Sequence, residues 1–265
     1  MAYQLYRHTA TSREPVSYDD LDNKAFWCRL GNEKEAAFVR RMVTVASKYS
    51  IEIHPEKTNN PFHPDLLLKS DSHGEMPAEV KIKNSPLFYA RQRYNIDPQH
   101  ALTLDLKDSF NYCRLLAEGT DLVIFIWVNW DAHEMVRTTK RGGSRTEEGF
   151  TVRPMEGIWA IRFSKLRHFE ETNPPPIHWY KEPFRHPPSH FADSDKQWRR
   201  ELLAFDRRLQ LDNGDVRGIA SRGYTQQDGK LYPAGQSSGS YVFDLRNKVF
   251  RELYYRIAEQ DIQYK

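Results

Sequence analysis

Hydrophobic and polar residues follow one another along this chain in patterns that predict a mixture of strands and helices. The strongest strand signal is residues 122–130, a nearly continuous apolar run of the kind found in strands covered on both faces. Residues 78–83, AEVKIK, alternate with a period of two, and residues 65–68, DLLL, form a buried-strand pattern before them. The turn-forming segment KSDSHGEMP separates these two strands, so together they predict a β-hairpin. Residues 51–54 predict a further short strand.

A helix is predicted to follow Leu30, because apolar residues recur at helical spacing at Val39, Met42, Val43 and Ala46. Asn32 is the expected N-cap, since Glu35 three residues later would complete a capping box. Glu35 lies on the same face as the apolar residues, whereas Glu33 points away from it.

Further elements are predicted on either side of the strongest strand. Residues 106–116 predict a helix that ends near Gly119, and residues 157–163 predict a strand followed by a short helix around Leu166. The first 20 residues are polar and are expected to be irregular. Residues 84–98 and 138–149 are expected to be loops, the second of them polar, locally basic and glycine-bearing.

The composition changes after residue 172, where prolines become frequent. We therefore expect a core over residues 1–172 and a C-terminal α+β extension over residues 173–265, which can still pack as part of one domain. Within the extension, an amphipathic helix is predicted from Trp198, Leu202, Phe205 and Leu209, and a strand-plus-helix pattern begins at Tyr241.

Composition narrows the functional classes only a little. With 265 residues, 39% of them hydrophobic, the chain is long enough for a well-packed core, and its net charge of +3 permits a nucleic-acid partner without requiring one. No apolar run is long enough to cross a bilayer, and the N-terminus has no signal-peptide pattern. Two cysteines, Cys28 and Cys113, are too few for a disulfide framework or a four-cysteine zinc site, so a reducing cytoplasm is expected. A P-loop and a nucleophile elbow are both absent from the sequence.

The residues that carry chemistry lie on the predicted hairpin. Asp65 and Glu79 stand on neighbouring strands, where their carboxylates could hold a hard divalent cation such as Mg²⁺ or Mn²⁺ between them. Glu79 and Lys81 are two residues apart on one strand, so their side chains project from the same face. Lys81 could then orient an attacking water or stabilise negative charge, and the carbonyl oxygen of Val80 would be a natural additional metal ligand.

This arrangement closely resembles the PD-(D/E)XK nuclease superfamily. The similar residues are GNEKE at 31–35, Pro64-Asp65, and Glu79-Val80-Lys81, and the resemblance covers roughly residues 24–170. It implies a restriction-endonuclease-like core in which helices flank a mixed central β-sheet. It also implies that Asp65 and Glu79 bind metal, that Lys81 is catalytic, and that Glu35 assists through metal or water.

Simpler interpretations of the same residues stay open. Glu35 could be only the capping partner of Asn32, and Glu79 with Lys81 could be a solvated strand face with a weak surface ion pair. His63, next to Pro64, is a candidate metal ligand or proton carrier, or else a structural or exposed histidine.

The function that these patterns favour is metal-dependent cleavage of DNA by an endonuclease of phage, mobile-element or restriction type, with double-stranded DNA preferred. RNA cleavage and a non-cleaving nucleic-acid-binding module on the same fold are the alternatives. The C-terminal extension would recognise substrate or make a homodimer. Residues expected to contact nucleic acid, each with a solvated surface as its alternative, are Lys83, Arg91, Arg93, Tyr94, Lys140, Arg141 and Arg145.

Overall fold

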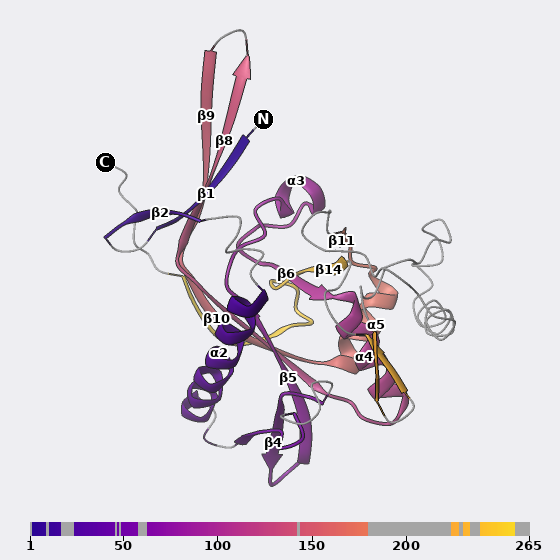
Figure 1. Cartoon of the computed structure of the whole chain (residues 1–265). Helices are drawn as coiled ribbons and strands as arrows, with labels where there is room; N and C mark the ends of the chain where they lie inside the picture. Colours follow the sequence, from indigo (N-terminus) through magenta and orange to yellow (C-terminus); the bar gives the residue numbers. More distant parts are fainter. Residues whose placement is uncertain are drawn as a thin grey trace.

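The chain folds around a six-stranded mixed sheet (Figure 1). The computed structural model describes residues 2–8, 11–16, 24–45, 47, 49–57, 63–141, 144–179, 224–227, 230–233 and 239–257. The strand order in this sheet is β15 (Arg251–Ile257), β10 (Met155–Arg162), β7 (Val123–Trp130), β5 (Gly74–Lys83), β4 (Leu66–Ser70) and β3 (Ser50–Ile53). β5 and β7 run parallel, and their other neighbours are antiparallel. The predicted hairpin β4–β5 and the predicted central strand β7 are therefore confirmed.

Strand β7 contributes to two hydrophobic cores, one on each face of the sheet. Ile124 and Ile126 belong to one core, and the alternating residues Phe125 and Trp127 belong to the other. This alternation follows from the period of two in a strand, and it explains why the run is apolar on both faces.

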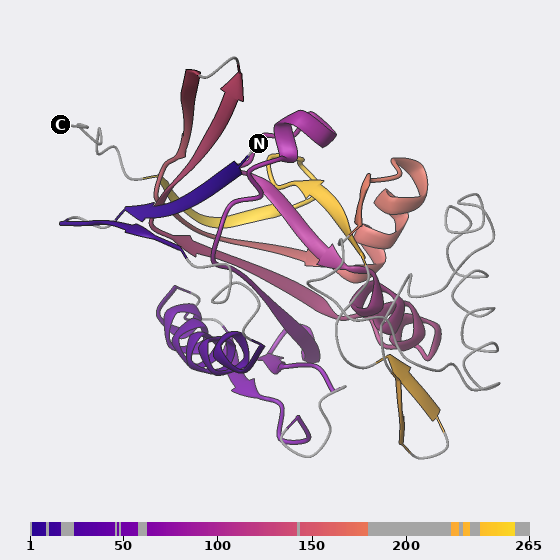
Figure 2. The same cartoon turned by 45° about the horizontal axis from the view of Figure 1, so that its top comes forward.

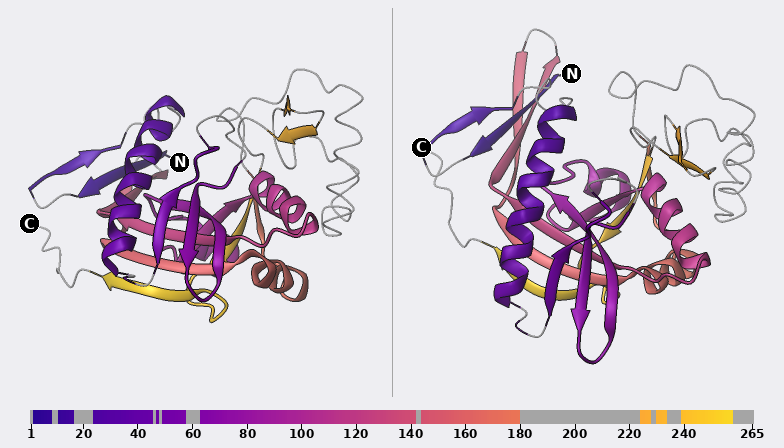
Figure 3. Two further views of the ribbon diagram at one scale, coloured as in Figure 1. Left: turned by 90° about the horizontal axis from the view of Figure 1, so that it is seen from below. Right: turned by 60° about the horizontal axis from the view of Figure 1, so that its bottom comes forward.

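Helix α2 (Lys24–Val45) covers the β3–β5 side of the sheet (Figure 3). Its inward face is anchored by Phe38 and Met42, which are fully or almost fully buried. The helix begins at Lys24, so the prediction that Asn32 is its N-cap is wrong: Asn32 lies inside the helix and is exposed. Val43 was placed on the apolar face but is 48% exposed.

The opposite face of the sheet is covered by two helices and a small sheet. Helices α4 (Leu106–Ala117) and α5 (Phe163–Thr172) agree with the predictions for these segments, and α4 ends before Gly119, whose positive φ of 90° permits the turn. The small sheet has the order β11 (Ile177–Trp179), β14 (Gly239–Asp244) and β6 (Ala101–Asp105). Its side chains share one hydrophobic core with both helices.

Two segments that were expected to be irregular form a second sheet. Its order is β2 (Arg13–Pro15), β1 (Ala2–His8), β8 (Ala132–Arg141) and β9 (Ser144–Val152). The first 20 residues therefore contain two strands, and the expected loop 138–149 is instead the distal part of the β8–β9 hairpin. This hairpin extends away from the central sheet, and β1 lies alongside β8 (Figures 1 and 2).

The segment after residue 172 adds strands both to the six-stranded central sheet and to the small three-stranded sheet. β14 pairs with β6, and β15 pairs with β10, so strands from either side of residue 172 share the same sheets. β15 occupies the place where a helix was predicted to close the chain, and that prediction is wrong. Strands β12 (Tyr224–Gln227) and β13 (Lys230–Pro233) form a separate hairpin. The helix predicted from Trp198 to Leu209 lies outside the described residues.

Candidate active site

Asp65 is held rigidly at the start of β4. Its side chain is 9% exposed, and its Oδ2 accepts a hydrogen bond of 2.8 Å from the backbone N–H of Val80 on the neighbouring strand. Its own carbonyl oxygen accepts a hydrogen bond of 3.0 Å from the N–H of His54. Because a buried carboxylate needs such partners, the hairpin itself fixes the position of the acid.

Glu79 and Lys81 lie side by side on one face of β5, as the alternation predicted. The Lys81 ammonium donates a hydrogen bond of 2.9 Å to Oε1 of Glu79. Val80, between them, points into the core beneath α2. The side chains of Glu79 and Lys81 are only 16% and 23% exposed, so this is not the fully solvated surface pair that the simpler interpretation required.

Helix α4 supplies two residues that the sequence did not reveal as part of the site. Lys81 also donates a hydrogen bond of 2.9 Å to Oδ2 of Asp108, in the first turn of α4. The same ammonium lies 5.6 Å from the centre of the Tyr112 ring, one helical turn further on. A possible signal was the i, i+4 spacing of Asp108 and Tyr112 on a helix, but nothing local identified β5 as their neighbour.

Glu35 and Asp65 are joined by Lys57, a third residue that sequence reasoning missed. The Lys57 ammonium donates to Oε1 of Glu35 at 2.5 Å and forms an ion pair with Oδ1 of Asp65. Lys57 belongs to the turn after β3, where its N–H donates to the carbonyl oxygen of His54 at 3.1 Å. Glu35 therefore faces the hairpin from α2, and the capping alternative for it is wrong because Asn32 caps nothing. We call the resulting group the carboxylate cluster: Glu35, Lys57, Asp65, Glu79, Lys81 and Asp108.

The charges of the carboxylate cluster shift one another's protonation equilibria. Burial raises the pKa of Glu79 to about 7, and the negative charges of Asp65 and Asp108 add to the effect against the attraction of Lys81. Burial and the charge of Asp65 likewise raise the pKa of Glu35. Two glutamates thus have a raised pKa, whereas the ammonium of Lys81 lowers the pKa of Asp108 against the effect of burial. Perturbed ionisable groups that lie together are typical of functional sites.

The pKa values of the two lysines are raised as well, and for an ammonium group this favours the charged form. Burial lowers the pKa of Lys81, but the charges of Asp108 and Glu79 outweigh burial and hold it well above its ordinary value. Burial also lowers the pKa of Lys57, but its contacts with Asp65 and Glu35 outweigh burial and raise that pKa above its ordinary value. Both lysines are therefore positively charged at neutral pH.

Lys83, expected to contact nucleic acid or else to be a solvated residue on the same strand face, is buried. It is 9% exposed, and its ammonium lies 6.0 Å from the centre of the Trp130 ring. Burial lowers the pKa of Lys83 to about 7. This environment does not suit a solvated contact to phosphate.

The loop after β5 places the next three predicted contact residues differently from one another. It contains a short helix, α3 (Ala90–Tyr94), which the sequence had suggested as irregular. Arg91 is 67% exposed and lies 3.7 Å from Asp97, whereas the hydroxyl of Tyr94 is hydrogen-bonded to Nδ1 of His178 at 2.8 Å. The guanidinium carbon of Arg93 lies 5.2 Å from the centre of the Tyr89 ring. Arg91 and Arg93 are thus exposed, whereas Tyr94 is partly buried.

The remaining predicted contacts lie on the distal β8–β9 hairpin. The backbone pairs Lys140 with Arg145 and Arg141 with Ser144. These residues stand on strands that extend away from the central sheet (Figure 1). The structure does not bring them to the carboxylate cluster.

A groove on the surface lies apart from the carboxylate cluster. Its volume is about 950 Å³, and its lining includes Tyr49, Lys69 and Gly74, at the end of β4 opposite Asp65. None of the cluster residues lines this groove. This groove is therefore not part of the candidate site, which is defined by its ionisable side chains.

Comparisons with known proteins do not add to this geometry. Searches of protein-family models, of curated proteins and of solved structures found no match. Within the described residues, no helix is long and apolar enough to span a membrane. The functional argument therefore rests on the residues of the site.

Proposed function

We propose that this chain is a metal-dependent nuclease with a restriction-endonuclease-like core of the PD-(D/E)XK type. The observation that carries the proposal is the assembly of Glu35, Asp65 and Glu79 around Lys81, from two strands and a helix. Such a set combines oxygen ligands for a hard cation with a fixed ammonium group, which are the parts that phosphodiester hydrolysis needs.

The charge of the carboxylate cluster fits a divalent cation. Its four carboxylates and two lysines leave a formal charge of −2 when all are ionised. Burial and the neighbouring negative charges raise the pKa of Glu35 and Glu79, so a cation that neutralises these carboxylates is favoured at this place. Asp65, Glu79 and the carbonyl oxygen of Val80 would hold Mg²⁺ or Mn²⁺, with Glu35 as a further ligand or water-holding group.

Lys57 occupies part of the space that the cation would need. Among the described residues, Glu35, Asp65 and Glu79 do not bring their carboxylate oxygens within 4.8 Å of one another. The Lys57 ammonium stands between two of them instead. Cation binding would therefore displace Lys57 from Asp65.

The chain's own residues would divide the remaining work. A bound divalent cation supplies Lewis-acid stabilisation of charge on the phosphoryl oxygens. The Lys81 ammonium, fixed between Glu79 and Asp108, is placed to orient a water molecule or to stabilise developing negative charge. Asp108 acts on Lys81 and is a positioning residue.

The proposed substrate is DNA, with double-stranded DNA preferred and endonucleolytic cutting expected. RNA is the alternative substrate for the same site. The exposed Arg91, in the segment that follows β5, is a predicted phosphate contact that is accessible from solvent.

The test is cleavage of linear, circular and single-stranded DNA, with RNA alongside, in Mg²⁺ or Mn²⁺. Wild type is compared with Asp65→Asn and Lys81→Met, and with the controls Asp71→Asn and Lys69→Met, which alter the same residue types at exposed positions near the β4–β5 turn. We expect both site variants to lose cleavage by at least about 100-fold and both controls to keep it.

Other results would overturn the proposal. Cutting that survives both site variants would place the chemistry elsewhere. No cutting of any substrate, together with no Mg²⁺ or Mn²⁺ binding, would leave a non-cleaving nucleic-acid-binding module. Selective cutting of RNA would keep the site and change the substrate.

A further inference from the structure

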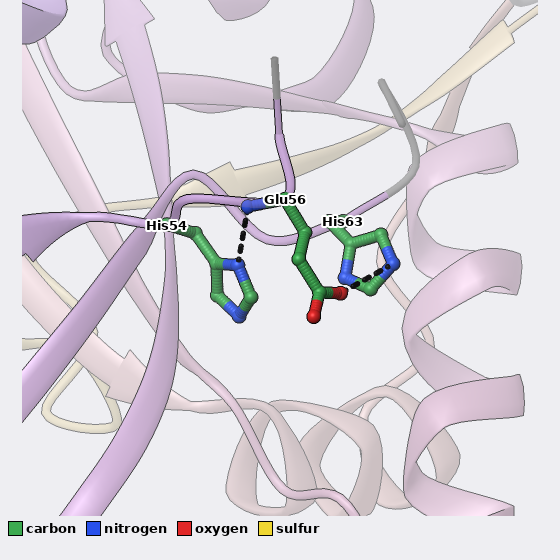
Figure 4. Close-up of side chains that lie close together, drawn as sticks. All are labelled: His54, Glu56 and His63. Carbon is green, nitrogen blue, oxygen red and sulfur yellow. Dashed lines mark hydrogen bonds and ion pairs between the residues drawn. The ribbon is translucent and has the colours of Figure 1, made fainter. Parts of the chain in front are cut away.

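A second group of metal-ligand side chains lies beside the carboxylate cluster but is chemically distinct from it. His54, Glu56 and His63 each offer one ligand atom, and these three atoms lie within 4.8 Å of one another. Figure 4 shows the Glu56 carboxylate between the two imidazole rings. Among the described residues, this is the one group in which three such side chains come so close.

The fold brings the three residues together through the two arms that connect β3 with β4. His54 directly follows β3 and is hydrogen-bonded to the backbone of Asp65, while His63 lies two residues before Asp65 on the other arm. The turn closed by the Lys57 N–H and the His54 carbonyl then carries Glu56 toward His63. The two rings lie 5.4 Å apart, although nine positions separate these histidines in the sequence.

The contacts within the group resemble those between ligands of one ion. His63 Nε2 lies 3.1 Å from Oε2 of Glu56, and the Glu56 N–H donates to Nδ1 of His54 at 3.4 Å. Ligands of a tetrahedral zinc ion, at bond lengths of about 2.0–2.1 Å, lie roughly 3.3 Å from one another. The contact between the Glu56 carboxylate and His63 is close to this spacing, and the ligand atoms of all three residues lie within 4.8 Å of one another.

The donor set selects the class of metal. Two imidazoles and one carboxylate suit borderline transition-metal ions such as Zn²⁺, whereas the all-oxygen carboxylate cluster suits Mg²⁺. Glu56 and His63 have exposed side-chain fractions of 62% and 34%, so an ion can reach them from solvent. We propose that His54, Glu56 and His63 bind one transition-metal ion of the Zn²⁺ class, with a further coordination position open to water.

The position of this site gives the ion a structural consequence. Lys57, in the same turn as His54 and Glu56, pairs with Glu35 and Asp65. An ion that ties Glu56 to His63 would join the two arms and so restrain the turn from which Lys57 reaches the carboxylate cluster. The influence on catalysis rests on the proposed function, but the binding of Zn²⁺ does not.

The experiment is calorimetric titration of the full-length, metal-free protein with Zn²⁺ alone. The variants are His54→Ala, His63→Ala and Glu56→Gln, with His73→Ala as the matched control, because His73 is an exposed histidine on the β4–β5 turn outside the group. We expect one Zn²⁺ per chain in wild type and in the control. Each ligand variant is expected to bind at least about tenfold more weakly.

A second titration separates this site from the proposed catalytic one. The double variant Asp65→Asn, Glu79→Gln is expected to keep Zn²⁺ binding, and visible absorption of Co²⁺ in place of Zn²⁺ is expected to depend on His54 and His63 in the same way. Circular dichroism on each variant identifies any that fail to fold, and His54→Gln and His63→Gln replace such a variant.

Three results would overturn the proposal. These are no Zn²⁺ binding by wild type, equal affinity in the histidine variants and in His73→Ala, or loss of Zn²⁺ binding in the double carboxylate variant. Because the readout is metal binding, a chain that fails to cut any nucleic acid can still pass this test.

Discussion

The ammonium group of Lys81 lies 2.9 Å from the carboxylate of Asp108, and these residues come from a central strand and from the first turn of a helix 27 positions later. The pair is four-fifths buried, with exposed side-chain fractions of 23% and 21%. Lys81 is thereby held between two carboxylates, Glu79 and Asp108. An ammonium group held from both sides can present only a limited set of directions to a substrate, which is what a charge-stabilising group requires.

Replacing Asp108 by Asn should weaken this positioning without removing the Lys81 ammonium, which we propose to be catalytic. We expect cleavage to fall by about 10- to 100-fold and the free energy of unfolding to fall by about 1–3 kcal/mol, because a largely buried charged hydrogen bond is lost. Cleavage assays and urea denaturation measure the two effects. Asp71→Asn, the same substitution at an exposed position on the β4–β5 turn, is the control and should change neither.

The raised pKa of Glu79 predicts an unusual pH dependence of stability in the metal-free protein. The folded chain holds this proton up to about pH 7, whereas the unfolded chain releases it near the ordinary value of 4.5. The stabilisation is therefore complete below about pH 4.5 and is lost as pH rises through about 7. We expect the free energy of unfolding to lose on the order of 1–3 kcal/mol through Glu79 over this pH range. The loss is measured as the difference in free energy of unfolding between wild type and Glu79→Gln.

Bound Mg²⁺ should reverse this pH dependence of stability, because a cation favours the ionised carboxylate. Saturating Mg²⁺ is expected to stabilise the protein more at pH 8 than at pH 5. A stability difference between wild type and Glu79→Gln that does not change with pH would refute the assigned direction.

Lys57→Met should make the carboxylate cluster a better site for divalent cations. The lysine competes for Glu35 and Asp65, so its removal leaves two carboxylates without their internal cation. We expect Mg²⁺ to bind several-fold more tightly, and the metal-free protein to be less stable by about 1–3 kcal/mol. Calorimetric Mg²⁺ titration tests this, and Lys69→Met, which removes an exposed ammonium from β4, should leave Mg²⁺ affinity unchanged.

Lys83→Met should stabilise the protein at neutral and acidic pH. Burial lowers the pKa of Lys83 to about 7 in the folded chain from its ordinary value of 10.5, so the folded state releases a proton that the unfolded state keeps. Wild-type stability should therefore rise with pH between about 7 and 10.5, and this rise should be absent in the variant. Denaturation midpoints across this range, compared with those of Lys69→Met, measure the difference; equal slopes in wild type and Lys83→Met would contradict it.

The sequence by itself determined the parts of this protein that local patterns encode. The period of two in residues 78–83 placed Glu79 and Lys81 on one face, and the apolar run 122–130 indicated a strand between two cores. The turn formers between residues 69 and 77 fixed the hairpin that sets Asp65 against Val80. Each of these inferences depends only on neighbours a few residues away, so each could be made without knowing the fold.

Tertiary structure alone decided which distant residues complete the site. Lys57 contacts Glu35 from the turn after β3, and Asp108 contacts Lys81 from helix α4. No local spacing in the sequence encodes such contacts. Strand β15 looked helical in sequence but pairs with β10, because the edge of a sheet supplied hydrogen-bond partners that outweighed local preference. The same pairing of distant strands made β1 and β8 neighbours where loops were expected. Electrostatic partners and sheet edges are chosen by packing over the whole chain, and that choice creates both the carboxylate cluster and the neighbouring histidine group.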